Sequence, residues 1–338
     1  MRLAKARLSD VAKVAGVSPA TVSRVINSPD KVSAELRERV GAAVEKLHYV
    51  PDGAARALAS RKSRTIGVVV PTLDIAIFAA GVAALQARLN EAGYTLLVTN
   101  AEYDLKKEAQ EVRALIERGV DGLVLVGGGH APEIYKLLQT RGVPYVNTYH
   151  YASDKKHPCI GVDNRSAAGR VVDYLHDLGH RQFAVITSPV KHNDRIAARR
   201  DGFVERLAAH GIKAPARRVL EVPYSMADGR IALRSVVEGR RRITAVMCTN
   251  DVLAIGALFE CRALGVAVPR ALSVTGFDDL DLAMHVDPAL TTVHVPAAEI
   301  GRRAAGLVLA RIDRTEVPDR VELAANLIVR ASTGRPTS

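Results

Sequence analysis

Between residues 65 and 280 the chain alternates short apolar runs with longer segments that have the spacing of amphipathic helices. The apolar runs are IGVVVP (66–71), TLLVTN (95–100), GLVLVG (122–127), PYVN (144–147), FAVITS (183–188), AVMCTND (245–251) and LSVTGFDD (272–279). Such uninterrupted runs are typical of strands buried on both faces, so the alternation predicts parallel sheets covered by helices. The number of runs is roughly double that of one small open sheet. We therefore expect two similar α/β lobes, with a ligand site in the cleft between them at the carboxyl ends of the strands.

The first 50 residues carry a different pattern, that of short helices. The apolar residues at helical spacing are Leu8, Val11, Val14 and Ala15. Gly16 follows, where a helix can end in a left-handed residue. Ser18 is a favourable N-cap, and Pro19 suits the first helical position because its missing N–H costs nothing there. Two short helices joined by a tight turn predict a helix-turn-helix, whose second helix enters the DNA major groove.

The second of these helices has one packed face and one free face. Val22, Val25 and Ile26 lie within about 100° of arc, and Arg24 falls on the opposite side together with Ala20 and Asn27. A third helix is expected from the cap Ser33 to about His48. Its expected buried residues are Leu36, Val40, Val44 and Leu47. Periodicity alone also allows a small helical bundle with a charged surface.

The positive charge is concentrated near the N-terminus. The net charge is +11, and residues 1–64 hold 13 Lys and Arg against 6 Asp and Glu, whereas the rest holds 34 against 30. A basic head on a nearly neutral body is typical of a protein that binds a polyanion, although a solvated basic face would give the same count. Three scattered cysteines and the lack of an apolar stretch of ~18 residues favour a cytoplasmic protein with free thiols and no membrane span.

A short segment, YVPDGAARALASRKSRT, separates the head from the body. Asp52 could cap a brief helix that ends near Ala59, but Gly53 in its first turn costs ~1 kcal/mol relative to Ala. A helix of one or two turns is marginal in isolation, so we expect this one to form only when a partner orders it. Arg61, Lys62 and Arg64 then make a basic linker.

These motifs resemble a known family. DVAKVAGVSPATVSRVIN (10–27) is similar to the signature of the lactose-repressor (LacI/GalR) family of bacterial transcription regulators, and the similarity continues through residues 32–60. One departure is that Arg7 stands where the family usually has a capping Thr, so we expect Ser9 to move the cap inward.

The resemblance implies an α + α/β architecture over the whole chain. It places a three-helix DNA-binding domain at 1–50 and a hinge helix with its linker at 51–64. An effector-binding and dimerisation core shaped like a periplasmic sugar-binding protein would occupy 65–338. Its N-lobe would take about 65–163 and 296–323, and its C-lobe about 164–295 and 324–338.

The same resemblance, with the helix faces above, predicts the DNA contacts. They are Ser18, Pro19, Ala20, Thr21, Ser23, Arg24, Asn27 and Leu58. Arg24 is expected to contact a guanine through two hydrogen bonds, worth ~1–3 kcal/mol of discrimination. The resemblance places Leu58 as a wedge in the minor groove, where an exposed leucine is buried only if the DNA kinks.

Polar and aromatic residues just after the expected strands, or on the helices that follow, are candidates for the effector pocket. They are Asp74, Phe78, Tyr149, Asp163, Arg199, Asn250 and Asp278. Arg199, Asn250 and Asp278 match family positions that contact effectors, and an Arg with carboxylates can bind hydroxyls or an acid group. The family often has Asn-Pro-Phe-Phe after the first strand, but this chain has Ile-Ala-Ile-Phe at 75–78, so a standard sugar is not implied.

Other functions have weaker signals. LVGGGH (125–130) follows a strand but lacks the GK[ST] ending and the GxGxxG spacing of phosphate loops, so a strand-to-helix turn is favoured. We find no HExxH motif, metal-ligand cluster or nucleophile elbow, and expect no metal, cofactor or enzymatic activity. A stand-alone small-molecule-binding protein or a sugar-active enzyme with an incidental basic head are the alternatives. The prediction is a cytoplasmic homodimer, or a higher oligomer, that binds pseudo-palindromic operator DNA and a small-molecule effector and represses transcription.

Overall fold

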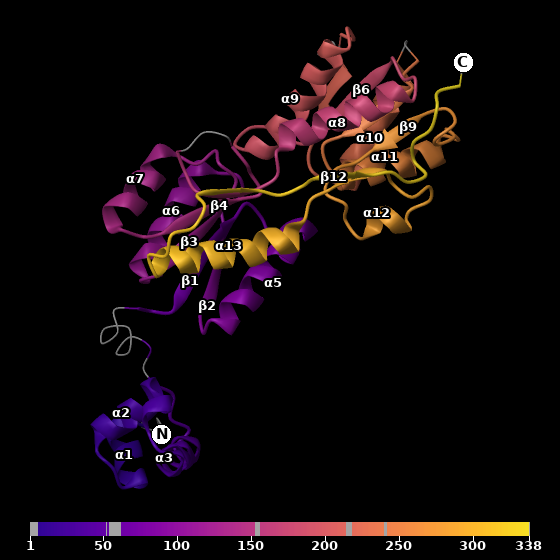
Figure 1. The fold of residues 1–338 in the computed structure, drawn as a ribbon. Helices are drawn as coiled ribbons and strands as arrows, with labels where there is room; N and C mark the ends of the chain where they lie inside the picture. The colour runs from indigo at the N-terminus through magenta and orange to yellow at the C-terminus, as the bar shows by residue number, and fades with distance from the viewer. Residues whose placement is uncertain are drawn as a thin grey trace. The chain divides into compact units, whose positions relative to one another are not determined.

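A computed structural model describes residues 6–51, 53, 62–152, 156–213, 218–239 and 242–337. The chain divides into two compact units, Met1–Ser63 and Arg64–Ser338 (Figure 1). The expected hinge helix, including Leu58, lies outside the described residues. Among the described residues, none of the helices has the length and apolar character needed to cross a bilayer.

The N-terminal unit is a three-helix bundle. Its helices are α1 (Leu8–Ala15), α2 (Pro19–Asn27) and α3 (Ala34–Lys46), with a short 3-10 turn η1 (Pro29–Lys31) before α3. Val11, Val22 and Val40 form the centre of its core. Gly16 ends α1 with a φ of 63°, and the Ser18 hydroxyl caps α2 by accepting a hydrogen bond from the backbone N–H of Thr21 at 3.1 Å. The predicted helix-turn-helix is confirmed.

The start of α1 differs from the expectation. The helix begins at Leu8, so the prediction that Ser9 is the cap is wrong. The Asp10 carboxylate accepts a hydrogen bond from the backbone N–H of Arg7 at 2.8 Å and thereby closes the first turn. An acidic residue also suits the positive end of a helix. Val14, which has helical spacing with Val11, is 46% exposed, and Ala12 takes the buried position instead.

In the second unit the chain builds two parallel sheets, as the alternation predicted. The first has the strand order β11-β5-β4-β3-β1-β2. Its strands are β1 (Thr65–Val70), β2 (Thr95–Asn100), β3 (Gly122–Val126), β4 (Tyr145–Thr148), β5 (Cys159–Gly161) and β11 (Arg320–Glu322). Helices α5 (Ala76–Glu91) and α13 (Ala297–Ile312) pack together on one face, and α6 (Leu105–Glu117) and α7 (Pro132–Arg141) cover the other (Figure 1).

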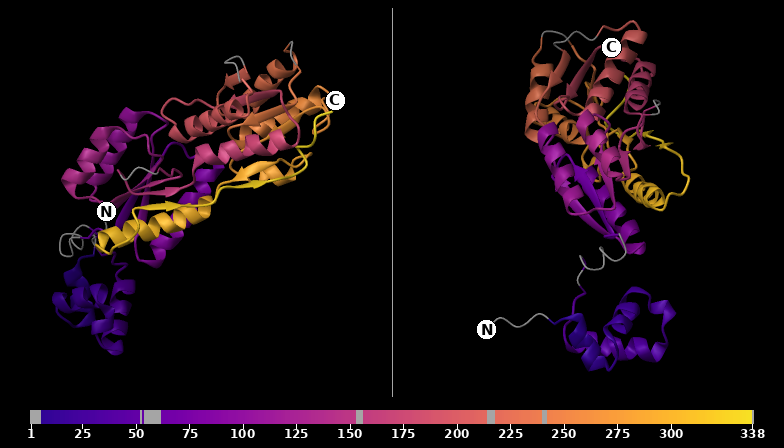
Figure 2. Two further views of the ribbon diagram at one scale, coloured as in Figure 1. Left: turned by 45° about the horizontal axis from the view of Figure 1, so that its top comes forward. Right: turned by 90° about the vertical axis from the view of Figure 1, so that its left-hand side faces the viewer.

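The second sheet has the order β7-β6-β8-β9. Its strands are β6 (Phe183–Thr187), β7 (Val219–Glu221), β8 (Ala245–Cys248) and β9 (Ser273–Thr275). Helices α8 (Asn164–Asp177) and α9 (Asp194–Ala209) pair on one side, and α10 (Met226–Val237) and α11 (Asp251–Ala263) pair on the other (Figure 2). A short helix, α12 (Leu282–His285), follows β9.

The chain runs between the two sheets three times: after β5, after the strand β10 (Thr292–His294), and after β11 into the strand β12 (Asn326–Ile328). Strands β10 and β12 pair antiparallel as a separate two-stranded ribbon. In Figure 1 the yellow segment that contains β12 leads from the first sheet to the second. Each of the two lobes is made of segments distant in sequence. The space between the two lobes is therefore lined by residues from many parts of the chain.

Candidate DNA-contact surface and ligand pocket

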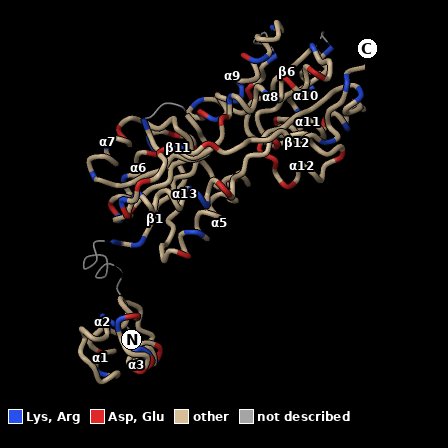
Figure 3. Tube along the Cα trace, viewed as in Figure 1, with Lys and Arg blue, Asp and Glu red and all other residues tan. Residues whose placement is uncertain are grey.

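The outward face of α2 presents short side chains and one arginine. Val22 and Val25 are buried in the core of the unit, and Arg24 projects on the opposite side. The exposed predicted contact residues are Ser18, Pro19, Ala20, Arg24 and Asn27, and Thr21 and Ser23 are half-buried. Figure 3 shows how the basic and acidic positions are distributed along the unit.

Hydrogen bonds within α2 engage several of these side chains. The Ser18 and Thr21 hydroxyls lie 2.8 Å apart, and the Asn27 amide donates to the Ser23 hydroxyl at 3.1 Å. The Arg24 guanidinium, in contrast, makes no hydrogen bond or ion pair with any residue that the structure describes. Its five N–H donors are therefore available to an external partner with paired acceptors.

The second unit contains a pocket of about 380 Å³, including open space at its mouth, at the carboxyl ends of strands from both sheets. Its lining residues are Ile75, Ile77, Phe78, Tyr103, Tyr149, Ser188, Asn193, Arg195, Ile196, Arg199, Tyr224 and Asp278. Four of the residues predicted for the effector, which come from four separate segments, meet here: Phe78, Tyr149, Arg199 and Asp278.

Arg199 and Asp278 form an ion pair at the inner wall of the pocket. Nη1 of Arg199 lies 2.8 Å from Oδ1 of Asp278, and both side chains are about 5–6% exposed. Arg199 also donates hydrogen bonds to the Asn164 side-chain oxygen at 2.8 Å and to the Thr249 carbonyl at 2.9 Å. Its guanidinium lies over the Phe277 ring, 3.8 Å from the ring centroid. Burial raises the pKa of Asp278, and the charge of Arg199 opposes this rise. Arg199 is thus held rigidly with its charge balanced.

An aromatic corner forms another wall. The rings of Phe78 and Tyr149 meet edge to face with centroids 5.3 Å apart. The Tyr149 hydroxyl donates to the carbonyl of Ile77 at 2.9 Å, and burial raises its pKa. Because this hydroxyl is satisfied within the protein, Tyr149 offers a ligand mainly the face and edge of its ring.

Residues at the start of α9 connect the second lobe to the glycine run. Arg195 donates to the Val126 carbonyl at 3.0 Å, and Asp194 accepts from the backbone N–H of Gly128 at 2.9 Å. An added Cβ on Gly127 would lie 2.2 Å from the Arg195 guanidinium, and the φ of Gly127 is 105°, so any other residue here would strain the backbone and displace the Arg195 side chain. Burial acts to raise the pKa of Asp194, but Arg195 and His150 outweigh it and the pKa is lowered. The run LVGGGH is therefore the surface on which α9 docks.

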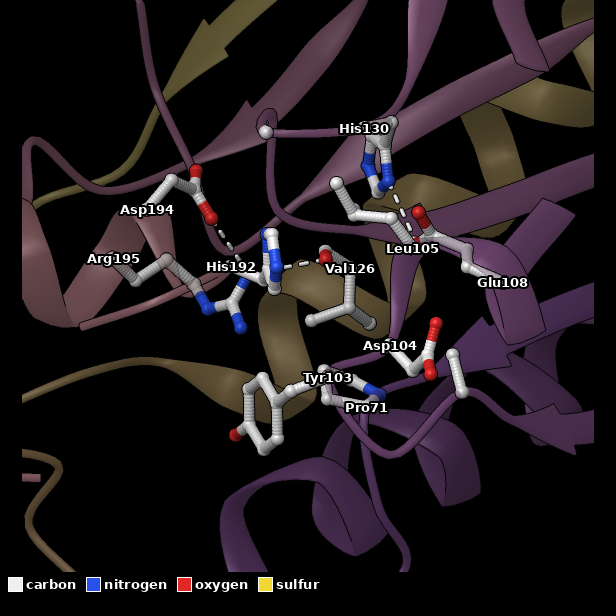
Figure 4. A pocket seen from close by; sticks show the side chains of 12 residues that line it. Pro71, Tyr103, Asp104, Leu105, Glu108, Val126, His130, His192, Asp194 and Arg195 are labelled. Atoms are coloured by element: carbon white, nitrogen blue, oxygen red, sulfur yellow. Dashed lines mark hydrogen bonds and ion pairs between the residues drawn. The ribbon is translucent and has the colours of Figure 1, made fainter. Parts of the chain in front are cut away.

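Arg195 and Tyr103 also line a second pocket, of about 330 Å³ including open space at its mouth (Figure 4). The imidazole of His130 bridges the Glu108 carboxylate at 2.8 Å and the Gly127 carbonyl at 3.0 Å, which holds the glycine run in place. Among the described residues, no group of three or more His, Cys, Asp or Glu side chains is arranged to hold a metal ion.

Three of the predicted pocket residues do not line the pocket that holds the Arg199–Asp278 ion pair. Asp74 is exposed, and Asp163 caps α8 by accepting from the backbone N–H of Ser166 at 2.9 Å. Asn250 is fully buried and caps α11 through Leu253 N–H at 2.9 Å. Their contact with an effector stays a prediction.

Sequence reasoning missed Tyr103, Arg195 and Tyr224, all of which line the pocket. Tyr103 follows the run TLLVTN by only three residues, so the strand-end rule could have found it. Arg195 and Tyr224 follow a loop and a three-residue strand respectively, where no periodic pattern marks the position.

Several pocket residues have positive φ angles: Tyr103 (58°), Tyr149 (60°) and Asp278 (116°). Residues other than glycine rarely adopt positive φ angles, and backbone strain of this kind is concentrated at functional sites. Each follows a strand, because the chain must turn sharply there to aim the side chain into the cleft.

The fold and the two sites define a class of protein, one that joins a helix-turn-helix unit to a two-lobed ligand-binding body. Residues 7–52 match the family described as bacterial regulatory proteins, lacI family, and residues 172–333 match the periplasmic binding protein-like domain. The HTH-type transcriptional repressor PurR of Escherichia coli O139:H28 is 32% identical over 330 residues, which cover 97% of this chain and 96% of PurR. The chain belongs to the LacI family of bacterial transcription regulators.

Solved structures agree with this assignment. A LacI-family transcriptional regulator from Silicibacter pomeroyi is 25% identical and superimposes with a TM-score of 0.89 over 98% of this chain and all of that one. The lac repressor dimer bound to operator and the anti-inducer ONPF is 27% identical, with a TM-score of 0.86 over 97% of this chain and 99% of the repressor.

Proposed function

We propose that the protein is a ligand-responsive transcriptional repressor that binds operator DNA as a homodimer and a small-molecule effector between its lobes. The observation that carries this proposal is Arg24 on the exposed face of the capped helix α2, where it has no hydrogen bond or ion pair with a described residue, in a chain whose other unit has a pocket lined by both apolar and charged side chains. The protein acts by binding in this proposal, without catalysing a reaction, as its relatives are transcriptional regulators.

On the operator, α2 of each protomer enters one major groove of a pseudo-palindromic site. Arg24 contacts a guanine, Pro19 and Ala20 make apolar contacts such as with a thymine methyl, and Ser18, Thr21, Ser23 and Asn27 contact phosphates. Leu58, from the segment outside the described residues, inserts into the minor groove between the two half-sites. The DNA-binding domain in this proposal is 1–50, the hinge 51–64 and the effector core 65–338.

In the effector core, Phe78 and Tyr149 pack against the ligand while Arg199 and Asp278 hydrogen-bond to it. Asp74, Asp163 and Asn250 complete the proposed set. The lobes are the two sheet-containing halves, about 65–163 with 296–323 and about 164–295 with 324–338. A ligand that prefers one arrangement of the lobes changes the operator affinity through the hinge.

The experiment that tests the DNA-binding proposal is selection of operator sequences from random duplexes, followed by titration of Arg24→Ala. We expect the selected sites to be inverted repeats. Loss of one bidentate guanine contact per half-site, ~1–3 kcal/mol each, weakens operator binding at least 10-fold. Arg39→Ala, which removes the same charge from the exposed surface of α3, is the matched control and should lower affinity for operator and random DNA equally. Equal losses of operator affinity in Arg24→Ala and Arg39→Ala would contradict the assigned role of Arg24.

A further inference from the structure

Each of the four strands of the second sheet is preceded by an arginine. Arg181 stands two residues before β6 and Arg218 one residue before β7, and Arg242 and Arg270 each stand three residues before their strands, β8 and β9. The four strands run parallel, so their amino ends meet at one end of the sheet, away from the carboxyl ends that face the pocket. We call this end of the sheet, with these four arginines and the C-terminal segment 333–337, the basic pole.

Contacts within the structure show that the segments of the basic pole lie together. Arg218 donates a hydrogen bond to the side-chain oxygen of Gln182 at 3.0 Å. Arg242 donates to the Thr337 carbonyl at 2.9 Å, and the Thr337 hydroxyl donates to the Arg270 carbonyl at 3.2 Å. The yellow C-terminal segment (Figure 1) therefore packs on the starts of β8 and β9.

Several arginines of the basic pole are held by neutral partners and keep an uncompensated charge. The Arg181 guanidinium donates to the backbone carbonyls of His176 and His180, both at 2.8 Å. The exposed arginines of the pole that form no ion pair with a described residue are Arg181, Arg242, Arg270 and Arg335. Their N–H donors and their charge are thus available to an anion from outside the chain.

Acidic side chains are scarce around the basic pole. The segments that build it and contain neither Asp nor Glu are 178–182, 242–244, 264–272 and 329–337. Two acids that flank these segments are directed to other partners, since Asp177 lies 3.8 Å from His176 and Glu238 lies 3.8 Å from Arg234. A surface of one sign of charge attracts polyanions and speeds their association.

The dimensions and chemistry of the basic pole fit the backbone of a DNA duplex. Neighbouring strands lie about 4.8 Å apart, so the four strand starts span roughly 14 Å. A duplex carries one negative charge per ~1.7 Å of its axis, so a row of this length meets several phosphates, which the arginine fork binds well. The segments without acids also contain no Phe, Trp or Tyr. They therefore offer no stacking platform to single-stranded bases and no aromatic anchor to a protein partner.

We propose that the basic pole is a second DNA-contact surface, which binds the phosphate backbone of a duplex without regard to sequence. This inference goes beyond the proposed function, because it requires neither an operator nor an effector. A protein with this surface in addition to the outward face of α2 holds two segments of duplex at once.

The first test measures this bridging with the full chain. A biotinylated duplex and a fluorescent duplex, both of random sequence, are mixed with the protein, and the fluorescence captured on streptavidin is recorded at about 50 mM and about 200 mM salt. Wild type should capture the fluorescent duplex, and the higher salt should release it. The triple variant Arg181→Ala/Arg242→Ala/Arg270→Ala should reduce capture at the lower salt about 10-fold or more, because the phosphate contacts and the counterions that they release are lost.

The matched control removes three exposed arginines from the lobe of the first sheet. Arg113, Arg118 and Arg141 lie on or next to α6 and α7 and form no ion pair with a described residue. Arg113→Ala/Arg118→Ala/Arg141→Ala changes the net charge by the same amount and should capture as much duplex as the wild type. Equal capture by the two triple variants would overturn the proposal.

A lysine variant separates the effect of charge from damage to the fold. Arg181→Lys/Arg242→Lys/Arg270→Lys alters the same hydrogen bonds to backbone carbonyls but keeps the three charges. It should retain capture within about 3-fold of the wild type, since most of the affinity for phosphates comes from charge. Capture as low as that of the alanine variant would show that the loss is structural, and the basic pole would not be a DNA surface.

An acidic protein is the competing partner for a basic surface. Polyglutamate is therefore compared with an unlabelled random duplex as a competitor, at equal total negative charge, for the part of the capture that depends on the three arginines. The duplex should compete about 10-fold better, because its phosphates are fixed in a dense row whereas a flexible chain of carboxylates must be ordered. Equal competition would assign the basic pole to acidic polypeptides and overturn the DNA proposal. Both duplexes are random in sequence, so a negative result leaves the proposed binding of operator and effector untouched.

Discussion

Asp251 illustrates how single residues beneath the pocket are fixed by their surroundings. It is fully buried at the start of α11, where its carboxylate accepts hydrogen bonds from the Leu280 backbone N–H at 2.7 Å and from the Thr292 hydroxyl. Its own backbone N–H donates to the Phe277 carbonyl at 2.8 Å. These bonds tie α11 to the turn that presents Asp278, so Asp251 supports the position of a pocket residue without lining the pocket.

This burial makes a prediction about pH. Burial and the nearby negative charge of Asp278 raise the pKa of Asp251 to about 7. An unfolded Asp ionises near pH 3.9, so between about pH 4 and pH 7 unfolding releases a proton and becomes easier as the pH rises. The stability contributed by the protonated form is present below pH 4 and is lost by pH 7. Relative to Asp251→Asn, the wild type should lose roughly 1.4 kcal/mol of unfolding free energy per pH unit in that window.

Urea unfolding at pH 4, 5, 6 and 7 measures this difference. Asp287→Asn, at an exposed side chain without an ion pair to a described residue, is the control and should follow the wild type at each pH. Parallel profiles of wild type and Asp251→Asn would show that the carboxylate is ionised throughout and would contradict the raised pKa.

At the scale of elements, the longer strands and most helices were predictable because their patterns are long enough to carry periodicity. The strand run at 95–100 coincides with β2, and α3 begins at the expected cap Ser33. Strands β7 and β11 have three residues each and were not predicted, since three residues define no period. Within the pocket, Asp278 was predictable from its place at the end of an expected strand run, and both Asp278 and Arg199 from their match to family positions that contact effectors. Arg195 and Tyr224 were not, because their role arises from contacts between segments distant in sequence.

The glycine run after β3 gives a prediction at this scale. Gly127 has a φ of 105°, and an added Cβ would collide with Arg195 and Asp194, whereas Gly142 has a φ of 64° with nothing within 4 Å of its Cβ position. Gly142→Ala should therefore cost only its backbone strain, about 1–2 kcal/mol. Gly127→Ala should cost roughly 3–5 kcal/mol, because strain is added to the loss of buried hydrogen bonds. Urea unfolding measures both, and equal costs would show that the docking of α9 on this loop adds no stability.

At the scale of the whole molecule, the positive charge that attracts DNA and the pocket proposed for the effector lie in different parts of the sequence. Residues 1–64 carry a net charge of +7 and the remaining residues one of +4, so the electrostatic attraction for DNA is concentrated in the smaller unit. The pocket of the larger unit pairs its charges internally, Arg199 with Asp278 and Arg195 with Asp194. Salt should therefore weaken operator binding steeply and affect the binding of an uncharged effector little.

The final prediction concerns the coupling of these two interactions. If a ligand changes operator affinity, operator DNA must change ligand affinity by the same factor, because both measure one coupling free energy. For a coupling of ~1–3 kcal/mol the factor is about 5–150.

A ligand that raises Tm is first found by thermal shift. The operator Kd is then measured with and without ligand, and the ligand Kd with and without a saturating operator duplex. Unequal factors would indicate that a second ligand site or a change of oligomeric state contributes. A factor of one for every ligand that binds would mean that the lobes do not communicate with the DNA-binding unit, because a ligand with equal affinity for two states shifts neither.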